Sequence, residues 1–290
     1  MKQALVIYNP VSGTKNWKNI PSLILKTLNE NNYQATWFET KKTNNQNFDK
    51  AFKERFHRII VIGGDGTVGQ VVSYMTKTKI KTPLIIIAQG SANILARALG
   101  LPILRIKTAI TKGLRNTGHA IDVMEINRNQ YSTIAAGIGY DTTIMKETSR
   151  SLKRALGPIA YGLTILKTFF FYKAQPYNLT IDGKRIPLVA KTVMVFNLIP
   201  LGHLRISKLI TGSQILPNDG LLNVIAFNPK SIFDLFSRHP KLQTFTGKTI
   251  SIKAHESNEF QIDGDIHKGK TIQIRTLPKA IRIVHTKKFQ

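Results

Sequence analysis

Residues 59–67, IIVIGGDGT, decide the fold of this chain, because an apolar strand runs into a glycine turn there. The apolar run favours a strand that is buried on both faces. The glycines let backbone N–H groups approach a ligand closely, and apolar residues from Val68 to Met75 then recur at helical spacing. Because the start of a helix attracts anions, the stretch predicts an anion site between a strand and a helix.

The same alternation of strand and helix recurs on both sides of this stretch. Residues 4–8 and 84–88 are further apolar runs of strand length, and residues 20–28 and 94–99 have helical periodicity. Such alternation is typical of a doubly wound α/β domain with a parallel sheet.

The pattern changes near Gly118. Beyond it, strand-like runs bounded by Gly, Pro or Asn follow one another, with one helical stretch at 148–171. We therefore expect an α/β domain at 1–118 and a β-sandwich-like domain at 119–277; the tail at 278–290 can return to the first domain. The strands expected in this part are residues 120–126, 131–136, 177–182, 192–198, 221–227, 249–253, 260–263, 271–275 and 280–284.

The composition indicates a folded and strongly basic protein. Its 290 residues include 42 Lys and Arg against 16 Asp and Glu, a net charge of +26, and 42% of them are hydrophobic. That share excludes a mainly disordered chain, and the absence of cysteine excludes disulfide scaffolds and cysteine nucleophiles. Neither a signal peptide nor a membrane span is expected, and the scattered histidines lack zinc-site spacing.

Two interpretations of the glycine turn compete. Residues 64–69 match the G-x-G-x-x-G dinucleotide pattern, but the next strand, residues 84–88, offers no acidic residue for a ribose. Asp65 would repel a resting phosphate unless a divalent cation or a reacting hydroxyl lay between them, which favours phosphoryl transfer from a magnesium nucleotide. A third interpretation is a tight turn in which Asp65 caps the helix.

Two further loops repeat the arrangement. Residues 8–13 follow the first strand, and residues 89–93 follow another, with Arg97 about one turn into the next helix. In open α/β sheets ligands bind at the carboxyl ends of the strands, so the loops are expected to meet. Ser91, Asn93 and Arg97 then supply donors to one anion site. The chain has no Walker-type phosphate loop.

Together these motifs resemble the diacylglycerol kinase catalytic family, which includes bacterial lipid kinases and sphingosine kinases. The resemblance implies an α/β nucleotide domain and a β-sandwich lipid domain, with ATP between them and Mg²⁺ as cofactor. The matching stretches are NPxSG at 9–13, GGDGT at 63–67, GSxNxxAR at 90–97, AGIGYD at 136–141, PNDGLL at 217–222 and IDGD at 262–265.

The resemblance also implies roles for individual residues. It places Asp65 near the transferring phosphate and Mg²⁺, with Asp122 nearby, and Asp219 as a ligand of a structural cation. The implied nucleotide contacts are Asn9, Ser12, Gly13, Thr40, Gly64, Gly66, Thr67, Ser91, Asn93 and Arg97.

The chain departs from the family pattern at several positions. Gly69-Gln70 stands where relatives often carry Asn-Glu, so one acidic group is missing. Ile94 replaces an Asp of many diacylglycerol kinases and is closer to sphingosine-kinase-like members. Asn223 replaces a frequent Asp, so the expected cation site loses a carboxylate. None of these changes removes the phosphate loops.

Asp263 and Asp265 are the candidates for the general base, since they resemble the family's Asp-Gly-Glu. Two residues apart in an extended chain, both side chains would point to the same face, and Gly264 would admit a close ligand. The alternative is an ordinary Asp-Gly turn between strands at 260–263 and 271–275.

The basic charge predicts an anionic partner. Residues 148–218 include ten basic residues and a single acid, Asp182, together with the aromatic run at 169–172. This composition is typical of an enzyme that docks on an anionic leaflet. A solvated lysine surface over core aromatics is the alternative. The ten are Arg150, Lys153, Arg154, Lys167, Lys173, Lys184, Arg185, Lys191, Arg205 and Lys208.

The expected function is transfer of the ATP γ-phosphate to a lipid hydroxyl, that of diacylglycerol or a related alcohol. The expected location is cytoplasmic and peripheral at the membrane, and a homodimer is left open. The alternatives are a sphingoid-base kinase, a nicotinamide-dinucleotide kinase sharing GGDGT, and a nucleic-acid-binding protein, which the pI near 10.3 allows.

Overall fold

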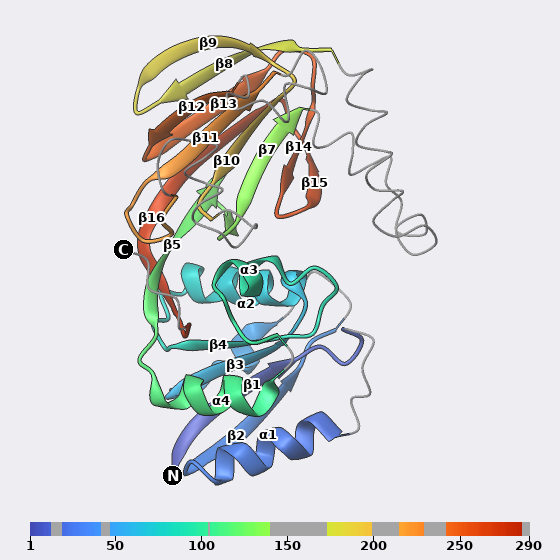
Figure 1. The fold of residues 1–290 in the computed structure, drawn as a ribbon, viewed down its shortest axis with the longest axis vertical. Helices are drawn as coiled ribbons and strands as arrows, with labels where there is room; N and C mark the ends of the chain where they lie inside the picture. Colours follow the sequence, from blue (N-terminus) through green and yellow to red (C-terminus); the bar gives the residue numbers. More distant parts are fainter. Residues whose placement is uncertain are drawn as a thin grey trace.

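The computed structural model describes residues 1–12, 19–41, 47–103, 105–139, 173–198, 215–228 and 242–285. Figure 1 shows an α/β lobe and a β-rich lobe stacked along the long axis, with β5 and β16 running between them. The expected class, an α/β part followed by a β-sandwich-like part, is confirmed. The helix expected at 148–171 lies outside the described residues.

The α/β lobe is built on parallel strands in the order β2-β1-β3-β4. One face of this sheet packs against α1 and α4, and the other against α2 and α3 (Figure 1). The elements are β1 (Lys2–Tyr8), α1 (Ile20–Asn29), β2 (Tyr33–Glu39), a 3₁₀ turn (Phe48–Lys50), β3 (Arg58–Gly63), α2 (Asp65–Lys77), β4 (Leu84–Ala88), α3 (Ile94–Ala98) and α4 (Ile106–Arg115).

Alternate residues of each central strand enter different cores. In β1, Leu5 and Ile7 pack on the side of α2 and α3, whereas Ala4 and Val6 pack on the side of α1 and α4. Successive side chains of a strand point to opposite faces, so a strand covered on both sides must be apolar throughout. This explains why the apolar runs identified the strands correctly.

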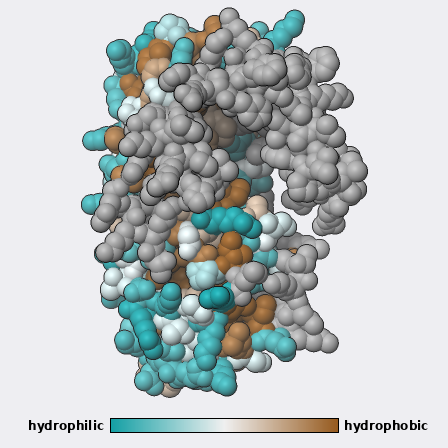
Figure 2. All heavy atoms as spheres, viewed as in Figure 1, coloured by the Kyte–Doolittle hydropathy of each residue, from teal (hydrophilic) through white to brown (hydrophobic). Residues whose placement is uncertain are grey.

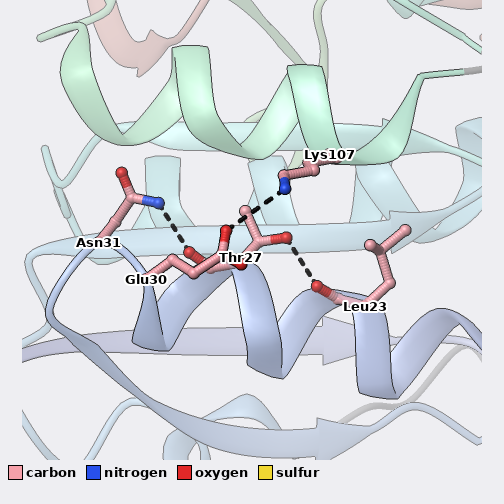
Figure 3. Close-up of polar contacts among 5 residues, drawn as sticks. All are labelled: Leu23, Thr27, Glu30, Asn31 and Lys107. Atoms are coloured by element: carbon pink, nitrogen blue, oxygen red, sulfur yellow. Dashed lines mark hydrogen bonds and ion pairs between the residues drawn. The ribbon is translucent and has the colours of Figure 1, made fainter.

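One ion pair joins the outer helices α1 and α4, and two hydrogen bonds lie within α1 and the turn that follows it (Figure 3). Lys107 Nζ lies 3.4 Å from the Glu30 carboxylate, while Thr27 Oγ1 donates to the Leu23 carbonyl and Asn31 Nδ2 to the Thr27 carbonyl, each at 2.7 Å. Both charged side chains of the ion pair are well exposed, so it contributes at most about 1 kcal/mol. The buried apolar residues between the helices therefore carry most of this packing.

The β-rich lobe consists of two sheets packed face to face. Its core contains Met124, Ile138, Tyr177, Val224 and Ile252, drawn from both sheets. One sheet has the order β12-β11-β10-β7-β14-β15, and the other continues the α/β sheet through β16-β13-β8-β9. The strands are β5 (His119–Ile126), β6 (Gln130–Ser132), β7 (Ala135–Gly139), β8 (Gln175–Ile181), β9 (Lys184–Ala190), β10 (Thr192–Phe196), β11 (Leu222–Phe227), β12 (Leu242–Gly247), β13 (Thr249–Ala254), β14 (Glu259–Ile262), β15 (Asp265–Lys268) and β16 (Thr271–Ile283).

A single long strand replaces the two that we expected at 271–275 and 280–284. β16 pairs with β13 and β5 in the β-rich lobe and ends beside β4, where Ile283 lies opposite Leu84. A shift of register between Leu277 and Ile281 accommodates Pro278. In the sequence this proline suggested a break between two strands. The chain thus returns to the α/β sheet, and one continuous sheet joins the lobes.

Other differences concern short or polar strands. Residues 131–136 were expected as one strand, but the structure divides them between β6 and β7, where the Ser132 hydroxyl accepts a hydrogen bond from the Ile134 N–H at 3.1 Å. Strands β9, β12 and β15, which the sequence did not indicate, lie at sheet edges. Edge strands are exposed and carry polar or charged residues, so they lack the apolar signal.

One of the hydrophobic clusters extends across both lobes. Val71 and Leu95 from α2 and α3 belong to the same buried cluster as Val123 of β5 and Ile281 of β16. In Figure 2 hydrophobic residues of the described ranges are visible at mid-height and also above and below it, whereas the lowest part is largely hydrophilic. The shared cluster holds the start of α2 in place relative to the β-rich lobe.

Candidate functional site

The turn between β3 and α2 presents backbone N–H groups at the start of a long helix. Gly64 is the N-cap of α2 in an extended conformation, with φ −87° and ψ −177°, and Asp65 is the first helical residue. A Cβ on Gly63 would lie 2.7 Å from Thr67 Cβ, so this turn tolerates no side chain there. At Gly66, by contrast, nothing lies within 4 Å of the Cβ position, so this edge of the helix is open to a ligand.

The loop after β4 lies directly against the glycine turn. A Cβ on Gly90 would lie 2.5 Å from Gly64 Cα, so the two backbones touch. Asn93, which has φ +50°, fixes the loop internally: its Oδ1 accepts from the Gly90 N–H at 2.8 Å and its Nδ2 donates to the Gly90 carbonyl at 2.7 Å. The side chain of Asn93 therefore shapes this loop, and its contact with a nucleotide stays a prediction.

The loop after β1 is tied to the same helix. Asn9 Nδ2 donates to Thr67 Oγ1 at 3.1 Å, and Asn9 Oδ1 accepts from the Val11 N–H at 3.1 Å. Thr40, at the end of β2, is buried and bonds the Tyr8 carbonyl through its N–H at 2.9 Å. Ser12 belongs to the Asn9 loop. Gly13, the next residue predicted to contact a nucleotide, lies outside the described residues.

Asp65 joins the glycine turn to α3. Its Oδ1 accepts a hydrogen bond from the Leu95 N–H at 3.4 Å, which places the carboxylate between the two loops. Arg97 is exposed and donates through Nε to the Ala92 carbonyl at 2.8 Å, and Ser91 is exposed on the same loop. The three loops therefore meet at the carboxyl ends of β1, β3 and β4, with a carboxylate and a guanidinium beside them.

The β-rich lobe brings two further acids to this place. Asp263 and Gly264 are the two residues of the turn between β14 and β15, with φ of +49° and +98°. Positive φ at both positions is the type I′ geometry that Asp-Gly favours. The expectation of an extended chain from Asp263 to Asp265 was therefore wrong, because the backbone reverses here. The turn leads into β15, a strand that the sequence did not indicate.

The two acids of this turn have different environments. Asp263 Oδ1 accepts from Ser132 Oγ at 2.5 Å and from the Ala135 N–H at 3.0 Å, whereas Asp265 is exposed. Burial raises the pKa of Asp263 to about 6; the bonds from Ser132 and Ala135 lower it, and the charges of Asp65 and Asp265 raise it. The acids of the two lobes are thus close enough to interact.

Asp122, one of the predicted metal ligands, is buried in a backbone corner. Its two carboxylate oxygens accept from the Gly220 N–H at 2.6 Å and the Lys279 N–H at 2.7 Å. Burial raises its pKa, while these two N–H bonds lower it. Asp219 is exposed and accepts from the Leu221 N–H at 2.9 Å. The structure therefore gives both carboxylates partners within the protein; their roles as metal ligands stay predictions.

The described residues fit a magnesium ion that is bound together with a nucleotide. Within the described ranges, no three His, Asp or Glu side chains are arranged to hold a metal ion. Mg²⁺ commonly uses one or two carboxylates plus substrate phosphates and waters, rather than a cage of protein ligands. Asp65, beside an open helix N-terminus, fits that pattern.

A cavity of about 610 Å³ lies away from this site, on the outer face of the sheet formed by β5, β16, β13 and β8. Glu125, Arg275 and Ser251 are among its lining residues, and Arg275 already donates to the Glu125 carboxylate. None of the residues that line this cavity belongs to the glycine loops.

Among the helices that the structure describes, none is long and apolar enough to cross a membrane.

Comparison with known proteins agrees with the division into two lobes. A model of the diacylglycerol kinase catalytic domain matches residues 3–126, and one of the YegS C-terminal NAD kinase beta sandwich-like domain matches residues 133–285. The chain belongs to the diacylglycerol kinase catalytic family. It is therefore an ATP-dependent lipid kinase. The first match ends with β5, and the second begins at residue 133, just before β7.

Individual relatives cover nearly the whole chain. Curated proteins named diacylglycerol kinase from Staphylococcus aureus (strain MRSA252) and Staphylococcus carnosus (strain TM300) are each 25% identical over 91% of this chain and over 86% and 89% of their own lengths. The crystal structure of a diacylglycerol kinase from Bacillus anthracis str. Sterne has a TM-score of 0.77, 23% identity and 98% and 97% coverage. An NAD kinase from Archaeoglobus fulgidus in complex with ATP has a TM-score of 0.55 at 14% identity, over 95% of this chain and 90% of its own. Both structures support the fold alone.

Sequence reasoning missed Ser132, whose hydroxyl donates to Asp263 Oδ1 of the hairpin at 2.5 Å. The two residues are 131 positions apart, and an isolated serine in a short strand carries no motif. Gln130 and His267, which join β6 to β15 at 3.2 Å, were missed for the same reason.

Proposed function

We propose that this chain phosphorylates diacylglycerol at the surface of an anionic membrane. The observation that carries the proposal is the meeting of Asp65 with two touching glycine loops, Gly64 and Gly90, opposite the acidic hairpin of the β-rich lobe. The curated relatives named diacylglycerol kinase support this choice of lipid. The match to the diacylglycerol kinase catalytic domain supports ATP as the phosphoryl donor.

The proposed nucleotide site uses the backbone at Gly64 and Gly66 together with polar side chains from neighbouring loops. The N-terminus of α2 and its backbone N–H groups suit the phosphates, and Arg97 adds a positive charge beside them. The further contacts proposed are Asn9, Ser12, Gly13, Thr40, Thr67, Ser91 and Asn93. Asp65 would hold Mg²⁺ together with the phosphates, and this ion would neutralise the charge of the transferring group.

In the proposed reaction the oxygen of the lipid hydroxyl bonds to the γ-phosphorus of ATP. The bond from that phosphorus to the β–γ bridging oxygen breaks, and ADP leaves with the electron pair. The hydroxyl proton passes to a carboxylate, for which the exposed Asp265 is the candidate. Ile266, the next residue of β15, is 37% exposed and provides apolar surface beside that acid.

The substrate is tested with ATP labelled on the γ-phosphate. Mixed vesicles containing diacylglycerol or sphingosine, and soluble NAD, are offered separately to the full chain. We expect label in the lipid product from diacylglycerol and little in the other two. Label only in sphingosine phosphate would assign the chain to sphingoid bases, and label in NADP would assign it to dinucleotides. No transfer at all with tight binding to random DNA would favour the nucleic-acid alternative.

The β8–β9 hairpin supports the proposed membrane contact. Lys184 and Arg185 are exposed on β9, and Val189 on the same strand is 57% exposed. Asp182, the acid of this turn, is already bonded to the Lys248 and Thr249 N–H groups. The hairpin therefore presents basic and apolar groups together, as a peripheral lipid-binding surface does. A homodimer stays a prediction.

Binding to vesicles is expected to depend on charge and salt. Sedimentation with phosphatidylglycerol vesicles should weaken as NaCl rises from about 0.15 M to 1 M, because the Debye length falls from about 8 Å to about 3 Å. The double variant Lys184→Glu, Arg185→Glu should bind more weakly than Lys53→Glu, Arg55→Glu, which changes the net charge equally on the other lobe. Equal binding of the two variants, or binding to neutral phosphatidylcholine vesicles at the same level, would contradict this surface.

A further inference from the structure

Strand β6 contacts both the helix that carries Asp65 and the hairpin that carries Asp263 and Asp265. On one side, Ser73 Oγ of α2 donates to the Tyr131 carbonyl at 3.4 Å. On the other, Gln130 contacts His267 Nδ1 of β15 at 3.2 Å, and Ser132 Oγ donates to Asp263 Oδ1 at 2.5 Å. Three consecutive residues thus contact both parts of the site.

The contact between Ser132 and Asp263 is the tightest of these. Ser132 is 1% exposed, and its hydroxyl also accepts from the Ile134 N–H at 3.1 Å, so the orientation of the O–H is fixed from two sides. A short hydrogen bond from a buried hydroxyl to a carboxylate is among the stronger neutral-to-charged contacts in proteins. The backbone adds to it, because the Asp263 N–H donates to the Ala135 carbonyl at 3.0 Å.

These contacts hold the turn and not only one side chain. Asp263 and Gly264 form the whole type I′ turn, and the Gly264 N–H donates to Gln261 Oε1 at 3.0 Å. The next residue is Asp265, whose side chain is exposed. A rotation of the turn would therefore move Asp265 directly, whereas the glycine loops of the α/β lobe would keep their geometry.

We propose that Ser132 is a positioning residue for phosphoryl transfer: its hydroxyl fixes Asp263, and Asp263 fixes the turn that sets Asp265 opposite Asp65. This inference rests on the proposed function and deepens it, because it divides the roles of the two hairpin acids. Asp263 acts as an acceptor that anchors the turn, and Asp265 acts on the lipid hydroxyl.

The first test is Ser132→Ala in the full chain. The variant should lower kcat by about tenfold to a hundredfold, because a displacement near 1 Å of a catalytic group has effects of this size. The KM for ATP should stay within about twofold of the wild-type value, since no contact of the glycine loops is removed. Wild-type kcat in folded Ser132→Ala would overturn the proposal. A rise in the KM for ATP and in the KM for the lipid with an unchanged kcat would also overturn it.

A second comparison uses two substitutions of the same residue, Asp263. Asp263→Asn keeps Oδ1 as an acceptor for Ser132 and Ala135, whereas Asp263→Ala removes it. The proposal predicts a kcat at least tenfold higher for Asp263→Asn than for Asp263→Ala, and effects of Ser132→Ala and Asp263→Ala that do not add in the double variant. Equal loss in both Asp263 variants would make Asp263 the base itself and overturn the assignment.

Another Asp-Gly hairpin turn offers a matched control. Asp182 and Gly183 form the same kind of turn between β8 and β9, and Asp182 Oδ1 accepts from the Thr249 N–H at 2.8 Å. With diacylglycerol in neutral detergent micelles, so that the β8–β9 membrane surface plays no part, Asp182→Ala should lower the melting temperature without lowering kcat. A loss of kcat at Asp263 is then not a general consequence of removing a side-chain hydrogen bond from an Asp-Gly turn. If Asp65→Asn and Asp265→Asn are both fully active, the proposed function itself fails, whatever Ser132→Ala does.

Discussion

Asparagine in place of Asp65 is expected to lower kcat by about a hundredfold to a thousandfold. The substitution removes the charge that lies between the glycine loops, at the place where the transferring phosphate is expected. It keeps Oδ1 as an acceptor for the Leu95 N–H, so the loops should keep their arrangement. The measurement is lipid phosphorylation with labelled ATP, alongside thermal unfolding of the same protein.

Asp49 provides the control for this substitution. It is an exposed acid of the same lobe, and its Oδ1 also accepts one hydrogen bond, from Tyr74 Oη at 2.8 Å. Asp49→Asn should retain wild-type kcat. If folded Asp65→Asn turned over at the wild-type rate, Asp65 would be the helix cap of the alternative interpretation, and the site would have to be sought elsewhere.

Alanine at Gly90 should be nearly as damaging, although it adds a single methyl group. Its Cβ would lie 2.5 Å from Gly64 Cα and 3.0 Å from Asn93 Oδ1. Backbone cannot move aside as a side chain can, so the two phosphate loops must separate. We expect a loss of about 1–3 kcal/mol in the free energy of unfolding, and a fall in kcat/KM for ATP of about a hundredfold.

Gly69 is the matched glycine for comparison. It lies inside α2, and nothing is within 4 Å of its Cβ position. Gly69→Ala should raise the free energy of unfolding by about 0.5–1 kcal/mol, because alanine loses less conformational entropy in a helix, and ATP kinetics should not change. Similar ATP kinetics in Gly90→Ala and the wild type would show that the contact between the loops is unimportant for nucleotide binding.

Much of the α/β lobe could be predicted because its signals are local. A strand covered on both faces must be apolar throughout, as residues 84–88 are, and a helix shows its period within a few turns. The edge strands β9, β12 and β15 could not be predicted. Solvent can hydrogen-bond the backbone groups on the outer edge of such a strand, so its sequence does not need an apolar run. Pro278 misled for a related reason: it suggested a break where β16 only shifts register.

For the candidate site, the sequence by itself determined the residue types and the loops: the glycines, Asp65 and the Asp-Gly pair are each specified by backbone geometry or charge within a few residues. Tertiary structure alone decided which of these meet. Gly64 touches Gly90 because β3 and β4 are neighbours in a parallel sheet. Ser132 reaches Asp263 across 131 residues because β7 pairs with β14, and packing between distant strands leaves no local trace in the chain.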